Sequence, residues 1–245
     1  MLLKGNDMAL ESKKNIFDEK RLRAKHENAN SYTVSASVMR RMPRYFRFLR
    51  DLLNNDILRI SSGDLAKLMN ITPSQVRQDF NSFGDFGQQG YGYNVKFLYT
   101  QVSRILCVNK KYSAVIIGAG DITKALLSTN IFDIRGIRIK GVFSYDKCDV
   151  GTKCKDFTVL STDELKDFCN GDISIAVLAL PEINDDVCDF IADCGINGVW
   201  NFSTSELHSD KIKCQNVMLG DTLMLLMNEI NENELLRNGE NKNGN

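Results

Sequence analysis

The chain has 245 residues, of which 43% are hydrophobic and 25% are charged, a balance typical of a globular protein. Basic and acidic residues number 31 each, which excludes a protein coated in positive charge but allows a local basic patch. The longest apolar runs, such as residues 173–180, are too short to span a membrane, and residues 1–30 contain no signal-peptide core. We therefore expect a cytoplasmic protein without a membrane partner.

Seven cysteines are scattered along the chain without a CxxC pair. This spacing predicts reduced, mostly buried thiols of the kind found in cytosolic proteins. A redox-active thiol is an alternative that depends on neighbouring groups, which the sequence does not show.

The pattern of the sequence predicts five segments. Residues 1–37 are polar without a sustained apolar period, which indicates a flexible arm. Residues 38–100 have helical apolar spacing, whereas residues 101–217 alternate short β-rich runs with helical stretches, as in a parallel α/β sheet. An amphipathic helix over residues 218–236 is followed by a tail at 237–245, and the helix carries apolar side chains at Leu223, Leu226, Met227 and Ile230.

A helix-turn-helix is predicted within the second segment, with helices at residues 38–54, 63–69 and 73–82. Thr72 suits the N-cap of the third helix and Pro73 suits its first position. Since Val76 and Phe80 lie four residues apart and face the core, the outward side chains are those of Ser74, Gln75, Arg77, Gln78 and Asn81. This is the arrangement of a recognition helix that enters the DNA major groove.

Other features of this segment also favour DNA. The first predicted helix carries several arginines, Arg41 and Arg44 among them, which we expect to be available to phosphate. The glycine-rich residues 83–93 predict a hairpin wing. Nine basic minus five acidic residues between positions 37 and 100 leave a charge of +4. The alternative is a helical protein-interaction module with a solvated arginine face.

The third segment begins with a strand, a glycine turn and a helix. Strands are predicted at residues 113–117, 137–143, 173–180 and 198–201, and helices start near Asp121, Thr162 and Ile183. The first strand runs into Gly118-Ala119-Gly120-Asp121-Ile122-Thr123, a context in which a glycine loop binds the pyrophosphate of a dinucleotide.

Three positions depart from the dinucleotide pattern. Thr123 replaces the third glycine, and we expect its branched side chain to intrude between helix and strand; Asp121 adds a negative charge at the helix start. After the second strand, Ser144 occupies the position of the ribose-binding acid and Asp146 lies two residues later. One alternative is a domain that is retained for dimerisation and whose ligand site has decayed. Another is a site in which Ser144, beside Lys147, accepts a ribose 2′-phosphate.

Together the two halves resemble the Rex family of redox-sensing transcriptional repressors over residues 38–230. The similarity is carried by residues 41–45, 60–62, 75–80, 83–84, 90–93, 180–181, 195–196 and 199–202. The resemblance implies an α/β protein, with an N-terminal winged helix-turn-helix and a C-terminal Rossmann-like doubly wound parallel sheet. It also implies a homodimer on a palindromic double-stranded operator, with the C-terminal helix exchanged between subunits. In the family NADH releases DNA, whereas NAD⁺ competes without releasing it.

The resemblance also assigns residues to sites. It implies a DNA-binding region that begins at Met42 and ends at Asn81, and it adds Ser61, Ser62 and the wing residues Gln88 and Gln89 to the candidates. Family members usually carry basic residues at Gln78, Gln88 and Gln89, GxGNLG at 118–123 and an acid at Ser144. The lost cationic contacts predict weaker binding at physiological salt.

We therefore expect a repressor that responds to the NADH/NAD⁺ ratio. The alternative is a ligand-independent regulator, or one that forms a heterodimer with a paralogue. No constellation of a nucleophile and a base stands out, so no catalytic residue and no metal ligand is expected.

Overall fold

The computed structural model describes residues 35–83, 92–183 and 186–242, and the side chains up to residue 234. The chain forms two compact units, the first ending at Cys107 and the second beginning at Val108. The predicted boundary after residue 100 falls within helix α5 (Val95–Ile105), which packs against helix α2 (Ala36–Asn54) of the first unit.

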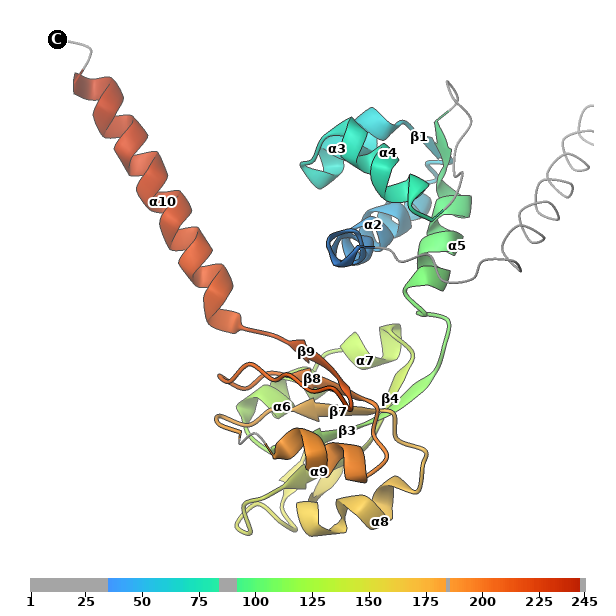
Figure 1. The fold of residues 1–245 in the computed structure, drawn as a ribbon, viewed down its shortest axis with the longest axis vertical. Helices are drawn as coiled ribbons and strands as arrows, with labels where there is room; N and C mark the ends of the chain where they lie inside the picture. Colours follow the sequence, from blue (N-terminus) through green and yellow to red (C-terminus); the bar gives the residue numbers. More distant parts are fainter. Residues whose placement is uncertain (1–34, 84–91, 184–185, 243–245) are drawn as a thin grey trace, which may run out of the picture. The chain divides into compact units, whose positions relative to one another are not determined.

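The first unit contains the predicted helix-turn-helix (Figure 1). Its other elements are helices α3 (Ser62–Met69) and α4 (Pro73–Asn81) and strands β1 (Arg59–Ile60) and β2 (Tyr93–Asn94), which pair antiparallel. Ser61 and Thr72 cap α3 and α4 through their hydroxyls, and Asn70 adopts a left-handed conformation at the end of α3. Capping and turn chemistry therefore fix the angle at which α4 leaves α3.

The core of the first unit joins α4 to α2 and β2. Met42, Tyr45 and Val76 are fully buried, and the Phe80 ring lies 4.8 Å from that of Tyr45 and 5.3 Å from that of Tyr93, between ring centroids. This confirms the inward face predicted for α4. Its opposite face is left for solvent.

The second unit is a seven-stranded sheet in the order β5-β6-β4-β3-β7-β8-β9. Its strands are β3 (Tyr112–Ile117), β4 (Ile137–Ser144), β5 (Lys153–Cys154), β6 (Phe157–Ser161), β7 (Ile175–Leu178), β8 (Gly198–Asn201) and β9 (Lys213–Asn216). All neighbours are parallel except the β5–β6 pair. Without the edge strand β5, this is the doubly wound order of a Rossmann fold, with its switch point between β3 and β7.

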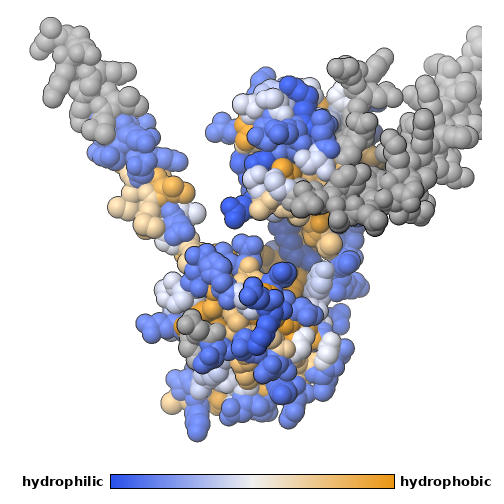
Figure 2. All heavy atoms as spheres, viewed as in Figure 1, coloured by the Kyte–Doolittle hydropathy of each residue, from blue (hydrophilic) through white to orange (hydrophobic). Residues whose placement is uncertain are grey.

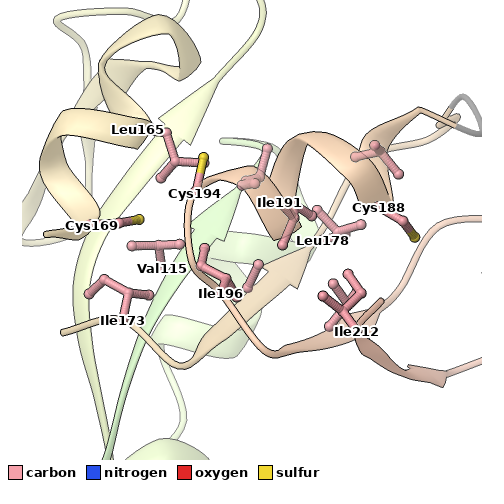
Figure 3. Packing of buried hydrophobic residues seen from close by; sticks show 14 of the residues in the cluster. Val115, Leu165, Cys169, Ile173, Leu178, Cys188, Ile191, Cys194, Ile196 and Ile212 are labelled. Atoms are coloured by element: carbon pink, nitrogen blue, oxygen red, sulfur yellow. The ribbon is translucent and has the colours of Figure 1, made fainter. Parts of the chain in front are cut away.

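Helices cover both faces of this sheet (Figure 1). One face packs against α6 (Asp121–Leu127) and α7 (Ile131–Ile134), and the other against α8 (Leu165–Cys169) and α9 (Val187–Asp193), with a 3₁₀ turn at Thr162–Glu164 before α8. Val115 and Leu178 meet Ile191 and Ile196 in the second of these cores (Figure 3). Strands β5, β6 and β9 and helix α7 were not predicted, β7 is shorter than the predicted strand, and α9 begins four residues after Ile183.

The last helix, α10, spans Leu219–Lys242 and is longer than predicted, because it continues through the residues expected to form a tail. Every side chain from residue 219 to 234 is exposed, including the large apolar ones of Leu223, Leu226, Met227 and Ile230. Figure 2 shows the apolar surface that they create. None of the described helices is both long and apolar enough to span a membrane.

Candidate DNA-binding surface and nucleotide pocket

A buried carboxylate anchors the recognition helix α4 to α2. Asp79 is fully buried and accepts two hydrogen bonds from the Arg41 guanidinium, both of 2.7 Å. The Tyr45 hydroxyl and the Gln75 amide donate two more, at 2.9 and 2.8 Å. Charge-assisted bonds of this kind are strong. The three from Arg41 and Tyr45 join α4 to α2, and the one from Gln75 lies within α4.

The electrostatics of this cluster keep its donors protonated. The hydrogen bond to Asp79 raises the pKa of the Arg41 guanidinium above its ordinary value. Burial, helped by the bond to Asp79, raises the pKa of the Tyr45 hydroxyl. Both side chains are therefore protonated hydrogen-bond donors near neutral pH.

These contacts show how three of the candidate residues are held. Arg41, whose side chain is 24% exposed, holds Asp79 through Nε and Nη2. Arg44 donates to the Met69 carbonyl at the end of α3, at 2.7 Å, so it ties α2 to α3. Gln75 was expected to point outward, but its amide turns inward to Asp79. The fold uses all three to position the helix-turn-helix.

The outward face of α4 is formed by the remaining predicted residues. Ser74, Arg77, Gln78 and Asn81 are exposed. Arg77 lies over α3, where its guanidinium donates to the Ser62 hydroxyl at 3.2 Å. The Ser61 hydroxyl is engaged with the backbone and carboxylate of Asp64 as a cap. Gln88 and Gln89, expected at the wing tip, lie outside the described residues.

The second unit contains a pocket of about 690 Å³ at the carboxyl ends of β3, β4 and β7. It is lined by Gly118, Ala119, Gly120, Ser144, Tyr145, Asp146, Asp149, Ala179, Leu180, Pro181, Glu182, Ile183, Asp186, Val187 and Phe190. In open α/β sheets this edge, at the switch point of the strand order, is where ligands bind.

The glycine loop fits the close approach of a dinucleotide. Gly118 has a φ of +111°, and a Cβ there would lie 2.3 Å from the Ala179 carbonyl oxygen, so glycine is required. A Cβ on Gly120 would meet nothing within 4 Å, which leaves open space beside the backbone. A pyrophosphate needs a backbone free of side chains at such a position.

Thr123 does not intrude as expected. Its side chain is fully buried and its hydroxyl donates to the Gly118 carbonyl at 2.6 Å, so it stabilises the loop where a third glycine would only leave room. Asp121 is exposed and pairs with Lys124 at 3.2 Å, and neither it nor Ile122 lines the pocket. The residue that replaces the third glycine therefore ties the start of α6 to the glycine turn.

The loop after β4 brings an unpredicted acid into the pocket. The Ser144 hydroxyl donates to Asp149 Oδ2 at 2.8 Å, and Asp149 lines the pocket. The carboxylate of Asp146 accepts from the Cys148 backbone N–H at 2.8 Å and so turns toward its own loop. In the sequence, Asp149 is visible only as an acidic residue five positions after Ser144, farther along the chain than the position at which the dinucleotide motif places its acid.

The opposite wall of the pocket comes from the segment after β7. Pro181 is fixed by Thr204, whose hydroxyl donates to the Pro181 carbonyl at 2.8 Å. The rings of Tyr145 and Phe190, both lining the pocket, lie 6.4 Å apart. Burial raises the pKa of the Tyr145 hydroxyl, which remains a hydrogen-bond donor at neutral pH. No local pattern in the sequence predicted that Tyr145 and Phe190 lie together at this pocket, because they come from separate segments.

The arrangement combines a capped helix-turn-helix with a pocket at the switch point of a Rossmann sheet. A family model described as "Putative DNA-binding protein N-terminus" matches residues 33–81, and one described as "CoA binding domain" matches residues 109–205. The fold and the two sites define a transcriptional regulator with a DNA-binding unit and a nucleotide-binding unit.

Similarity to known proteins extends over both units. The redox-sensing transcriptional repressor Rex of Caldicellulosiruptor saccharolyticus is 44% identical over 81% of this chain and 92% of its own length. Rex of Clostridium perfringens is 42% identical over 82% of this chain and 97% of its own. The chain belongs to the Rex family of redox-sensing transcriptional repressors, whose members are regulators rather than enzymes.

Two solved structures of a Rex-family repressor, RSP, have the same fold. RSP in complex with β-NAD⁺ and operator DNA has a TM-score of 0.75 and 40% identity, covering 84% of this chain and 96% of that one. RSP in complex with β-NADH has a TM-score of 0.75 and 37% identity, covering 84% and 98%.

Proposed function

We propose that this chain is a homodimeric repressor that binds a palindromic operator and releases it when its Rossmann unit binds NADH. The observation that carries the proposal is the coexistence, in one chain, of an exposed polar face on α4 and a pocket with an open glycine loop at the sheet's switch point. RSP, similar along both units, was solved with operator DNA and β-NAD⁺ and, separately, with β-NADH.

In the DNA-binding unit, four residues of α4 are the proposed base and phosphate contacts: Ser74, Arg77, Gln78 and Asn81. Arg77 is the main candidate for reading a base, because a guanidinium can donate two hydrogen bonds to guanine. Its bond to Ser62 at 3.2 Å holds it over α3 and is exchangeable, since both groups meet solvent. Gln88 and Gln89 are proposed wing contacts.

In the nucleotide unit, the glycine loop would hold the pyrophosphate beside Gly120, and the loop after β4 would hold the adenosine ribose. NADH and NAD⁺ differ by a hydride and a charge on the nicotinamide ring, so they are the redox signal itself. The chain's own part is to bind the two forms differently and so to shift its DNA-binding state.

Helix α10 is the proposed dimerisation element, exchanged between subunits. Its exposed apolar side chains are ones that a solvated helix seldom carries together. We expect Leu226→Glu to convert a dimer into a monomer in sedimentation velocity, with loss of affinity for a palindromic duplex. Asn228→Glu adds the same charge on the opposite side of the helix and should leave the dimer intact.

The alternative of a heterodimer with a paralogue is separated by the same measurement. The purified wild-type chain is expected to sediment as a dimer by itself. A monomer that assembles only when a paralogue is added would replace the homodimer in this proposal.

The proposal as a whole is tested by fluorescence anisotropy with the operator duplex of the RSP complex, at 0.15 M salt. We expect saturable binding of the wild-type chain, competed poorly by a scrambled duplex, and release when NADH is added. Operator binding that NADH leaves unchanged would support the ligand-independent regulator instead.

A further inference from the structure

Ser144 ends β4 at the position where dinucleotide-binding folds place a ribose-binding acid. The hydroxyl of this buried residue accepts from the Asp146 backbone N–H at 3.1 Å and donates to Asp149 Oδ2 at 2.8 Å. Ser144 therefore holds the following loop in place, and the carboxylate near the end of the strand belongs to Asp149, five positions later.

The backbone of Asp149 is also held in place. Its N–H donates to the Asp146 carbonyl at 3.1 Å, and its carbonyl accepts from the Thr152 N–H and hydroxyl at 3.0 and 2.6 Å. The carboxylate is thus pre-oriented before a ligand arrives, which lowers the entropic cost of binding. Among the described residues, no donor bonds to its second oxygen, Oδ1.

Asp146 is the competing candidate, and its surroundings differ. Its Oδ1 accepts from the Cys148 N–H at 2.8 Å, and the Cys148 thiol hydrogen-bonds to the same carboxylate. The Asp146 carboxylate therefore has two donors from Cys148 of its own loop, whereas the Asp149 carboxylate has one donor, the Ser144 hydroxyl.

The charge around this position sets which ribose fits. The described residues that line the pocket include Asp146, Asp149, Glu182 and Asp186, and none of them is Lys or Arg. Lys147, which would be needed to neutralise a 2′-phosphate, is not among the lining residues. A ribose hydroxyl can donate to a carboxylate, whereas a 2′-phosphate is repelled by it.

We propose that Asp149, oriented by Ser144, accepts hydrogen bonds from the adenosine ribose hydroxyls and selects NADH over NADPH. This rests on the proposed function, because it assigns the ribose end of the same pocket. It also explains how the chain does without an acid at the strand end: the carboxylate has moved to the following loop.

The test is to titrate NADH and NADPH, followed by their own fluorescence, into the wild-type chain and Asp149→Asn. We expect the wild type to bind NADH more tightly. Asp149→Asn should reduce the NADH-to-NADPH preference at least about tenfold, since it removes a hydrogen bond to a charged acceptor and the repulsion together. Ser144→Ala should shift the preference in the same direction by less.

Matched variants isolate the contact. Asp146→Asn removes the same charge from the same loop and should change the preference less than Asp149→Asn does, and Asp156→Asn, outside the pocket, should not change it. Equal effects of Asp146→Asn and Asp149→Asn, an unchanged preference in Asp149→Asn, or tighter NADPH binding by the wild type would each overturn the inference. Those outcomes leave the proposed function standing, whereas a wild type that binds neither dinucleotide refutes both.

Discussion

Asp79 in the DNA-binding unit and Asp149 in the nucleotide unit are carboxylates with opposite relations to their own chain. Asp79 is fully buried and has four donors from three residues, so nothing remains for a ligand. Asp149 is half-buried in a pocket wall, with one oxygen held by Ser144. An acid whose hydrogen-bonding capacity is filled by its own chain stabilises the fold, whereas an acid with an unbonded oxygen in a pocket wall can bind a ligand.

The largest expected effect is loss of the anchor in the DNA-binding unit. Asp79→Ala leaves Arg41 and Tyr45 without their acceptor in a low-dielectric setting, and we expect the free energy of unfolding to fall by about 3–5 kcal/mol. Urea denaturation followed by circular dichroism measures this. Asp51→Ala removes an exposed pair with Arg50 and should cost less than about 1 kcal/mol. Equal costs would show that Asp79 is not an anchor.

In the glycine loop, a residue needed for the fold can be compared with a residue proposed to lie beside the ligand. Gly118→Ala should destabilise the nucleotide unit by about 1–3 kcal/mol, because the residue has a positive φ and its Cβ would strike the Ala179 carbonyl. Gly120→Ala should leave the thermal midpoint nearly unchanged, since its Cβ has open space, and should weaken NADH binding. The proposed pyrophosphate position would be wrong if Gly120→Ala bound NADH like the wild type.

Arg77→Ala tests the ligand-facing side of the DNA-binding unit. The side chain is exposed, so stability should change by less than about 0.5 kcal/mol. Operator affinity should fall by about 1–3 kcal/mol in anisotropy at fixed salt, with relaxed sequence preference. Lys140→Ala makes the same charge change in the other unit and should not alter the preference. Undiminished operator binding by Arg77→Ala would remove α4 as the reading helix.

The smallest expected effect concerns Asp146, whose carboxylate faces its own loop. The hydrogen bond and charge of Asp146 raise the pKa of the Cys148 thiol. Because the thiolate is the reactive form, Asp146→Asn should lower that pKa and speed alkylation of Cys148 at pH 8. The alkylation rate should rise by less than about tenfold, because a tenfold rise would require the pKa of the thiol to fall by a full unit. Iodoacetamide labelling with peptide mass spectrometry measures it, and an unchanged rate would mean that Asp146 does not face Cys148.

Much of the local secondary structure of both units could be predicted from the sequence. The Val76–Phe80 spacing predicted the inward face of α4, Thr72 and Pro73 predicted its start, and the run into Gly118 predicted the strand-turn-helix of the nucleotide unit. These are local patterns, whose physical cause lies within a few residues.

The remaining features depend on contacts that local patterns do not encode. Arg41 meets Asp79 across 38 positions, so its spacing in the sequence could not distinguish it from a phosphate contact. Strand β9 is polar at Lys213 and Gln215 and has no run of apolar residues, although the sheet includes it. The polar end of α10 was expected to be a tail because apolar spacing stops there, yet the helix continues to Lys242.

The most direct test of the account is whether the nucleotide pocket binds NADH, although Thr123 replaces the third glycine of the motif and Ser144 replaces its acid. Isothermal titration of NADH into the wild-type chain and into Gly120→Ala answers this. The account predicts one site per chain in the wild type and weaker binding in the variant. No detectable heat or fluorescence change with the wild type at millimolar NADH would contradict it.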